Sequence, residues 1–180
     1  SVMKVSLAGR YPSSLSAGLP GAATIVPFTH PPDGDTTMPI TKGFRALVDE
    51  ARAQITTYSV EQVKARMGSD PSLQIVDIRD PRELEREGTV PGCVHAPRGM
   101  LEFWVDPASP YFKPVFGDDS KEFVLFCGAG WRSALATKAL QDMGMRNVAH
   151  IDGGFAAWTK DGAPVETLEA HKAASKAARG

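Results

Sequence analysis

The sequence around its second cysteine reads Phe123-Val124-Leu125-Phe126-Cys127-Gly128-Ala129-Gly130-Trp131-Arg132-Ser133. The four apolar residues that open this stretch form a short, continuous run, which is typical of a buried parallel strand. After the loop, small and apolar residues recur at helical spacing as far as Met143, and Gly144 is placed to end a helix. The pattern therefore predicts a strand over 122–126, a glycine-bearing loop, and a helix over 132–143.

The predicted loop places Cys127 where an anion would be stabilised. Backbone N–H groups in a loop that feeds a helix N-terminus point toward its mouth, and the helix end adds partial positive charge. Arg132 adds a full positive charge at the end of the loop. We therefore expect the thiolate of Cys127 to be favoured over the thiol. The expected anion-binding groups are Arg132 and the amides of Gly128, Ala129, Gly130, Trp131 and Arg132.

Composition indicates an ordinary globular domain. Of the 180 residues, 42% are hydrophobic and 23% charged, and no apolar run approaches the roughly 18 residues of a membrane span. The net charge of −1 gives no electrostatic reason to expect nucleic acid or a membrane as a partner. Two cysteines are too few for a disulfide framework and fit a reducing compartment, so we expect a cytoplasmic protein. The four histidines lack metal-ligand spacing, and we expect no metal or organic cofactor.

Strand and helix signals alternate along the rest of the chain, which implies βαβ units and a mostly parallel sheet covered by helices on both faces. Ser59 and Gln62 have the spacing of a capping box, which predicts a helix from Val60 that Gly68 ends. In such sheets the ligand site lies beyond the carboxyl ends of the strands, and Cys127 stands at that end. We expect further helical segments at 42–55, 82–86, 99–116 and 154–158, and strands at 73–78, 93–96 and 147–151.

Both ends of the chain differ from the middle. Residues 1–37 are rich in Ser, Gly and Pro, lack hydrophobic periodicity and contain no Asp or Glu before Asp33. We interpret them as a flexible leader, with a transit segment or added sequence as alternatives. Residues 38–166 then form the folded domain, and residues 167–180 an alanine-rich tail that forms a surface helix.

Four motifs in order resemble a single-domain rhodanese, over about residues 58–165. They are Val76-Asp77-Ile78-Arg79-Asp80-Pro81-Arg82-Glu83, the run from Gly88 to Pro97, the Cys127 loop, and Gly153-Gly154-Phe155-Ala156-Ala157-Trp158. The resemblance implies a three-layer α/β fold, a persulfide-forming cysteine at Cys127, Arg132 as the basic residue of the active loop, and sulfane sulfur transfer. Cys93 and Val90 depart from the usual pattern at positions away from the chemistry.

The resemblance also implies a choice between two chemistries. The sulfurtransferases of this fold have six residues from cysteine to arginine, and the related phosphatases one more. Here Cys127 to Arg132 spans six residues. A shorter ring of N–H donors suits one extra sulfur atom better than a tetrahedral phosphate, so sulfur transfer is favoured over phosphatase or arsenate reductase activity. The expected partners are a small sulfur donor such as thiosulfate and an acceptor, which is cyanide, a thiol or a protein. A persulfide carrier and a non-catalytic binding module remain as alternatives.

Other chemically capable residues have structural interpretations. We expect Cys93 to be a buried packing residue, with resolution of the Cys127 persulfide as the alternative. Asp77 is expected to accept loop N–H groups, and Arg79 to pair with Glu83. Arg98 could reach the mouth of the pocket. The indole of Trp131 is expected to line that mouth and limit the size of the acceptor.

Overall fold

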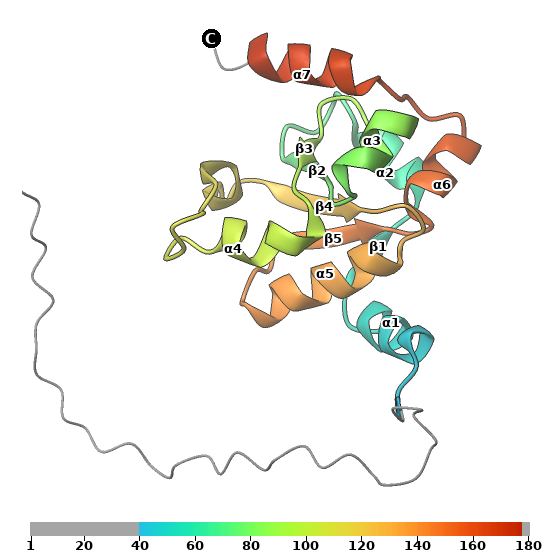
Figure 1. The fold of residues 1–180 in the computed structure, drawn as a ribbon, viewed down its shortest axis with the longest axis vertical. Helices are drawn as coiled ribbons and strands as arrows, with labels where there is room; N and C mark the ends of the chain where they lie inside the picture. Colours follow the sequence, from blue (N-terminus) through green and yellow to red (C-terminus); the bar gives the residue numbers. More distant parts are fainter. Residues whose placement is uncertain (1–39, 178–180) are drawn as a thin grey trace, which may run out of the picture. The chain divides into compact units, whose positions relative to one another are not determined.

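A computed structural model describes residues 40–177 and shows an α/β fold (Figure 1). Five parallel strands form one sheet in the order β1-β5-β4-β2-β3. Their bounds are β1 Thr56–Tyr58, β2 Leu73–Asp77, β3 Val94–His95, β4 Glu122–Phe126 and β5 Val148–Ile151. The expected parallel sheet is thus confirmed, and β4, which leads to Cys127, lies at its centre.

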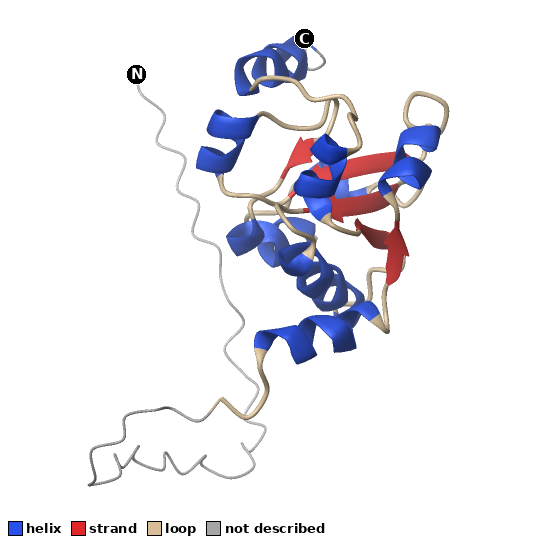
Figure 2. Cartoon of the chain, turned by 90° about the vertical axis from the view of Figure 1, so that its right-hand side faces the viewer, coloured by secondary structure: helices blue, strands red, loops and turns tan. Residues whose placement is uncertain are grey.

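Helices cover both faces of the sheet, as the sequence predicted (Figure 2). Each face has its own apolar core, because successive strand residues point to opposite sides. Val124 and Phe126 pack with α2 (Val60–Arg66) and α6 (Gly154–Lys160), whereas Leu125 and Cys127 pack with α4 (Leu101–Val105) and α5 (Trp131–Asp142). The α-helices are α1 Phe44–Arg52, α2 Val60–Arg66, α3 Pro81–Glu87, α4 Leu101–Val105, α5 Trp131–Asp142, α6 Gly154–Lys160 and α7 Leu168–Ala177. Two short 3-10 helices are η1 Arg98–Met100 and η2 Pro114–Gly117.

The N-terminal part of the domain differs from expectation in two ways. The helix expected over 42–55 is shorter, and of its apolar residues Phe44, Leu47 and Val48 only Val48 is buried, while the other two are about half exposed. The chain then forms β1, which the sequence did not predict because three residues are too few for an alternating pattern. The capping box of Ser59 and Gln62 is present as expected. The leader predicted for residues 1–37 lies outside the described residues.

The C-terminal segment contacts the domain through a few side chains. Glu166 forms a β-bridge with Thr89, and its carboxylate lies 2.8 Å from Nδ1 of His171. Leu168 and His171, both on α7, are buried. The rest of the helix is polar or alanine-rich and largely exposed.

A fully buried ion pair sits where β2 ends. Asp77 accepts hydrogen bonds from Nε and Nη2 of Arg79, from the Arg79 amide and from the Thr89 hydroxyl. Arg79 also donates to Glu87 and to the Gly88 carbonyl. Neither Asp77 nor Arg79 is accessible to solvent. The expected pairing of Arg79 with Glu83 is wrong, because Asp77 and Glu87 bind the Arg79 guanidinium and Glu83 binds Arg132 instead.

We predict that Arg79→Ala destabilises the protein strongly, by about 3–5 kcal/mol, because it leaves the Asp77 carboxylate buried without a counter-charge. Urea denaturation followed by circular dichroism measures this effect. Arg82→Ala is the matched control, since Arg82 forms an exposed ion pair with Asp80 and its loss should leave the midpoint unchanged. Equal midpoints for the two variants would contradict the role given to the buried pair.

Candidate active site

Cys127 lies directly after the carboxyl end of β4 and is only 1% exposed. The loop of Gly128, Ala129 and Gly130 follows, and α5 begins at Trp131. Gly130 is the residue before the helix and has a left-handed backbone with φ of 82°. The sequence thus predicted the strand, the loop and the helix correctly, to within one residue at the start of α5.

The first turn of α6 fixes the orientation of this loop. The amide of Phe155 donates to the Cys127 carbonyl at 2.7 Å, and the amide of Ala156 donates to the Gly128 carbonyl at 2.9 Å. In a trans peptide the N–H group points opposite to the carbonyl. The amides of Gly128 and Ala129 therefore point away from α6, toward the face of the sheet on which Cys127 packs. Among residues 40–177 these amides have no backbone partner, so they remain available to an anion.

Two glycines allow the loop and α6 to approach so closely. A Cβ atom on Gly154 would lie 2.2 Å from the Cys127 carbonyl oxygen and 2.8 Å from the Gly130 nitrogen. A Cβ atom on Gly130 would lie 3.0 Å from the Gly153 nitrogen. Real atoms do not approach to 2.2 Å, so position 154 must be glycine for these hydrogen bonds to form. The Gly153-Gly154 motif is thus explained by contact with the cysteine loop.

Arg132 is held by Glu83, which the sequence analysis expected to pair with Arg79. Its Nη1 and Nη2 both donate to Glu83 on α3, each at 2.7 Å. The Glu83 carboxylate, and after it the nearby Cys127 sulfur, raises the pKa of Arg132 above its ordinary value. The pKa of Glu83 is lowered, chiefly by its hydrogen bonds from Arg132. Glu83 also accepts from the Asp80 amide as part of a capping box, a sequence signal that could have identified it.

Comparison with known proteins agrees with this geometry. The family model described as a rhodanese-like domain matches residues 59–161, more than half of the chain. The chain belongs to the rhodanese-like family. Sulfurtransferases are among its relatives, which supports a transferase.

Three proteins to which the chain is similar have different descriptions. The chain is 29% identical to YrkF of Bacillus subtilis, provisionally named a sulfur carrier protein, over 61% of this chain and only 54% of YrkF. It is 28% identical to YtwF of the same organism, provisionally named a sulfurtransferase, over 62% of this chain and 97% of YtwF. A solved Rhodopseudomonas palustris protein of unknown function, described as a possible tyrosine phosphatase, is 51% identical with a TM-score of 0.70, covering 73% of this chain and all of that one.

Trp131 of this rhodanese-like domain packs against α1. Its ring centroid lies 5.0 Å from that of Phe44, and the Arg45 guanidinium lies 5.9 Å from the indole. Trp131 is 45% exposed. The Trp131 side chain thus joins the loop to α1, a helix that lies before the matched family region, and its expected place at the mouth stays a prediction.

The other sequence candidates lie apart from Cys127 or have other partners. Cys93 is buried in the core on the opposite face of the sheet, and its Sγ lies 3.2 Å from the Thr89 hydroxyl. Burial raises the pKa of the Cys93 thiol to about 12, which fits a packing residue. Arg98 pairs with Glu102 on the next helical turn. Nε2 of His95 lies 2.9 Å from the Arg79 carbonyl oxygen.

His150 is a buried polar residue that the sequence analysis did not single out. It lies on β5, with Nδ1 3.3 Å from the Ser133 hydroxyl of α5 and Nε2 3.1 Å from the Thr57 hydroxyl of β1. Burial, and secondarily the positive charge of Arg52, lowers its pKa to about 4. A neutral imidazole therefore links the first turn of α5 to two strands.

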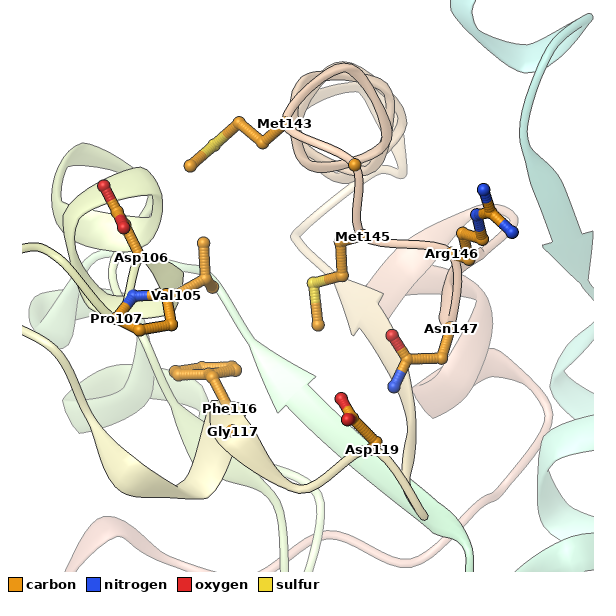
Figure 3. Close-up of a pocket in the computed structure, with 11 residues that line it drawn as sticks. Val105, Asp106, Pro107, Phe116, Gly117, Asp119, Met143, Met145, Arg146 and Asn147 are labelled. Carbon is orange, nitrogen blue, oxygen red and sulfur yellow. The ribbon is translucent and has the colours of Figure 1, made fainter.

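A cavity lies at the other end of the sheet. It has a volume of about 830 Å³ and lies beside the segments that precede β4 and β5 (Figure 3). Met145 and Phe116 face into it, and Asp106 and Asp119 are at its rim. Cys127 follows the carboxyl end of β4, so this cavity is separate from the candidate active site. Within residues 40–177 no cluster of side chains suits a metal ion, and no helix is long and apolar enough to cross a bilayer.

We predict that Gly154→Ala displaces the cysteine loop, because the added methyl group would overlap the Cys127 carbonyl. The variant should lower the melting temperature and the rate at which iodoacetamide alkylates Cys127. Gly162→Ala is the matched control, because Gly162 has a similar φ of 63° but nothing within 4 Å of its ideal Cβ. Backbone strain is thus common to both variants, and equal effects would show that contact with the loop is unimportant.

We also predict that the protein loses stability on acidification between about pH 6.5 and pH 4, because His150 takes up its proton in that range only when unfolded. The unfolded chain binds more protons there, so the free energy of unfolding falls as the pH falls. His150→Gln should flatten this part of the profile. Urea midpoints measured at several pH values test this, and a profile of unchanged slope in the variant would contradict it.

Proposed function

We propose that the protein is a sulfurtransferase that moves sulfane sulfur from a donor such as thiosulfate to a thiophilic acceptor through a persulfide on Cys127. The observation that carries this proposal is that the carbonyls of Cys127 and Gly128 accept hydrogen bonds from two amides of α6. It leaves the loop amides directed to the cysteine side, where Arg132 adds positive charge. Such a site stabilises a sulfur anion and the charge that develops during transfer.

In the first half-reaction the Cys127 thiolate attacks the outer sulfur of thiosulfate. A new S–S bond forms to Cys127, the S–S bond of thiosulfate breaks, and sulfite leaves with its electron pair. The amides of Gly128, Ala129, Gly130, Trp131 and Arg132 hold the negative charge of the persulfide. No change in the total oxidation level of sulfur occurs, so the step needs no external oxidant and no cofactor.

In the second half-reaction the acceptor attacks the outer sulfur of the persulfide. Cyanide would leave as thiocyanate, and a thiol would leave as a persulfide, while the Cys127 thiolate is regenerated. Two half-reactions that share one covalent intermediate predict ping-pong kinetics.

Both cysteines are unpaired in the structure, which fits a reducing compartment such as the cytoplasm.

Glu83 positions Arg132 in this proposal. The paired hydrogen bonds hold the guanidinium in one orientation, against Gly128, whose ideal Cβ would lie 3.2 Å from Nη2 of Arg132. This pair keeps the positive charge of Arg132 beside the loop, where it favours an anion on Cys127.

Two alternatives have specific support from the relatives. The similarity to YrkF favours a persulfide carrier that receives sulfur from a protein and passes it to another. The description of the Rhodopseudomonas palustris protein favours phosphatase activity on the same cysteine. The six-residue loop from Cys127 to Arg132 argues against the phosphatase.

We predict that incubation with thiosulfate adds the mass of one sulfur atom to the intact protein and that cyanide then removes it. Cys127→Ser should abolish the adduct, whereas Cys93→Ser, which changes the buried cysteine on the opposite face, should retain it. Intact-protein mass spectrometry after each incubation measures both results.

Three outcomes separate the functions. A thiosulfate adduct that persists in Cys127→Ser contradicts the assignment of the nucleophile. An adduct formed only from a protein persulfide donor favours the carrier. Hydrolysis of p-nitrophenyl phosphate that depends on Cys127, without any sulfur adduct, would replace the proposal by a phosphatase.

A further inference from the structure

Helix α1 lies outside the region that the family model matches, yet it contacts the cysteine loop. The match begins at residue 59, and α1 ends at Arg52. The helix packs against α5, whose N-terminus follows the loop (Figures 1 and 2). Phe44 and Arg45 contact the indole of Trp131, the first residue of α5. Arg52, the last residue of α1, also lies near the loop.

The Arg52 guanidinium lies between the loop and the turn that supports it. Its Nη2 is 2.9 Å from Oδ1 of Asp152, which directly precedes Gly153. The same nitrogen lies 3.4 Å from the position of a Cβ atom on Gly130. The Gly153 nitrogen lies 3.0 Å from the same position, so Arg52 and Gly153 both lie on the side of Gly130 where a side chain would stand.

A short series of contacts leads from Arg52 to Cys127. Asp152 is fixed by its ion pair with Arg52 and by its amide, which donates to the Tyr58 carbonyl at 2.9 Å. Gly153 and Gly154 follow, and the next two amides donate to the carbonyls of Cys127 and Gly128. Any shift of the Asp152 turn would thus move the two donors that orient the loop amides.

Two properties of Arg52 suggest more than attachment of a surface helix. Its side chain is only 32% exposed, and its Nε is buried without a hydrogen-bond partner among residues 40–177. The positive charge of Arg52 also acts on His150, which contacts Ser133 in the first turn of α5.

We propose that Arg52 is a positioning residue for sulfur transfer, which acts through Asp152 and the Gly153-Gly154 turn on the Cys127 loop. This inference rests on the proposed function and adds to it a residue of α1. Arg52 does not touch the sulfur. It holds the turn from which the Phe155 and Ala156 amides reach the loop carbonyls.

The experiment uses the full chain, four variants and one control variant. Arg52→Met keeps the apolar stem that packs beside α5 but removes the charge, and Arg52→Lys keeps the charge. Asp152→Asn removes the partner, and the fourth variant combines Arg52→Met with Asp152→Asn. Lys42→Ala is the matched control, because Lys42 forms an exposed ion pair with Glu50 near the same helix.

Three quantities are measured for each protein. They are the rate of Cys127 persulfide formation at saturating thiosulfate, the thiosulfate concentration at half-maximal rate, and the rate of Cys127 alkylation by iodoacetamide. The melting temperature shows how far each variant remains folded. A purely structural role would change the melting temperature and leave the transfer rate of the folded protein unaltered.

We expect Arg52→Met and Asp152→Asn each to slow persulfide formation about tenfold or more, since small displacements of a reacting group can cost that much. The half-saturating concentration should change little. The double variant should be no slower than either single variant, because both changes break one connection. Arg52→Lys should recover most of the rate, and the control should equal the wild type.

A rate of persulfide formation for Arg52→Met within twofold of the wild-type rate would overturn the proposal. The proposal would also fail if the rate of the double variant were reduced by the product of the two single-variant reductions. If Arg52→Met does not fold, the comparison of Asp152→Asn and Arg52→Lys with the wild type decides the matter in the same way. If the wild-type protein takes no sulfur from thiosulfate, the proposed function fails. The alkylation rates then still test Arg52, because alkylation requires only a correctly held thiolate.

Discussion

Two backbone hydrogen bonds organise this protein's site: those from the Phe155 and Ala156 amides to the carbonyls of Cys127 and Gly128. They turn the loop carbonyls toward α6 and so leave the loop amides for an anion. They also impose glycine at position 154, where a Cβ atom would meet the Cys127 carbonyl. Two of the four sequence motifs, the Cys127 loop and the segment that begins with Gly153-Gly154, are thus connected by one contact between two helix N-termini.

The buried ion pair of Asp77 and Arg79 lies next to this contact between the cysteine loop and α6 and stabilises it. The Arg79 guanidinium lies 3.8 Å from the ring centroid of Phe155, the residue whose amide holds the Cys127 carbonyl. Asp77, at the end of β2, fixes that guanidinium through three hydrogen bonds. The ends of β2 and β4 and the start of α6 are therefore tied together by charge, aromatic packing and backbone hydrogen bonds.

Sequence reasoning succeeded where the signal is local. Capping residues, positive-φ glycines and apolar runs act over a few residues, and they predicted β2, β4, α2 and α5 to within about two residues at each end. It failed where a partner is distant in the chain. Glu83 pairs with Arg132 rather than Arg79, and β1 was missed because only its pairing with β5 makes it a strand.

The sequence by itself determined the parallel α/β architecture, the placement of Cys127 after a buried strand and the helix that follows, because periodicity and capping are properties of neighbouring residues. The tertiary structure decided which side of the loop faces α6, which carboxylate holds Arg132, and that Arg52 and Trp131 bring α1 to the site. These depend on distances between residues up to about a hundred positions apart, which only the packing of the whole domain brings within hydrogen-bonding range.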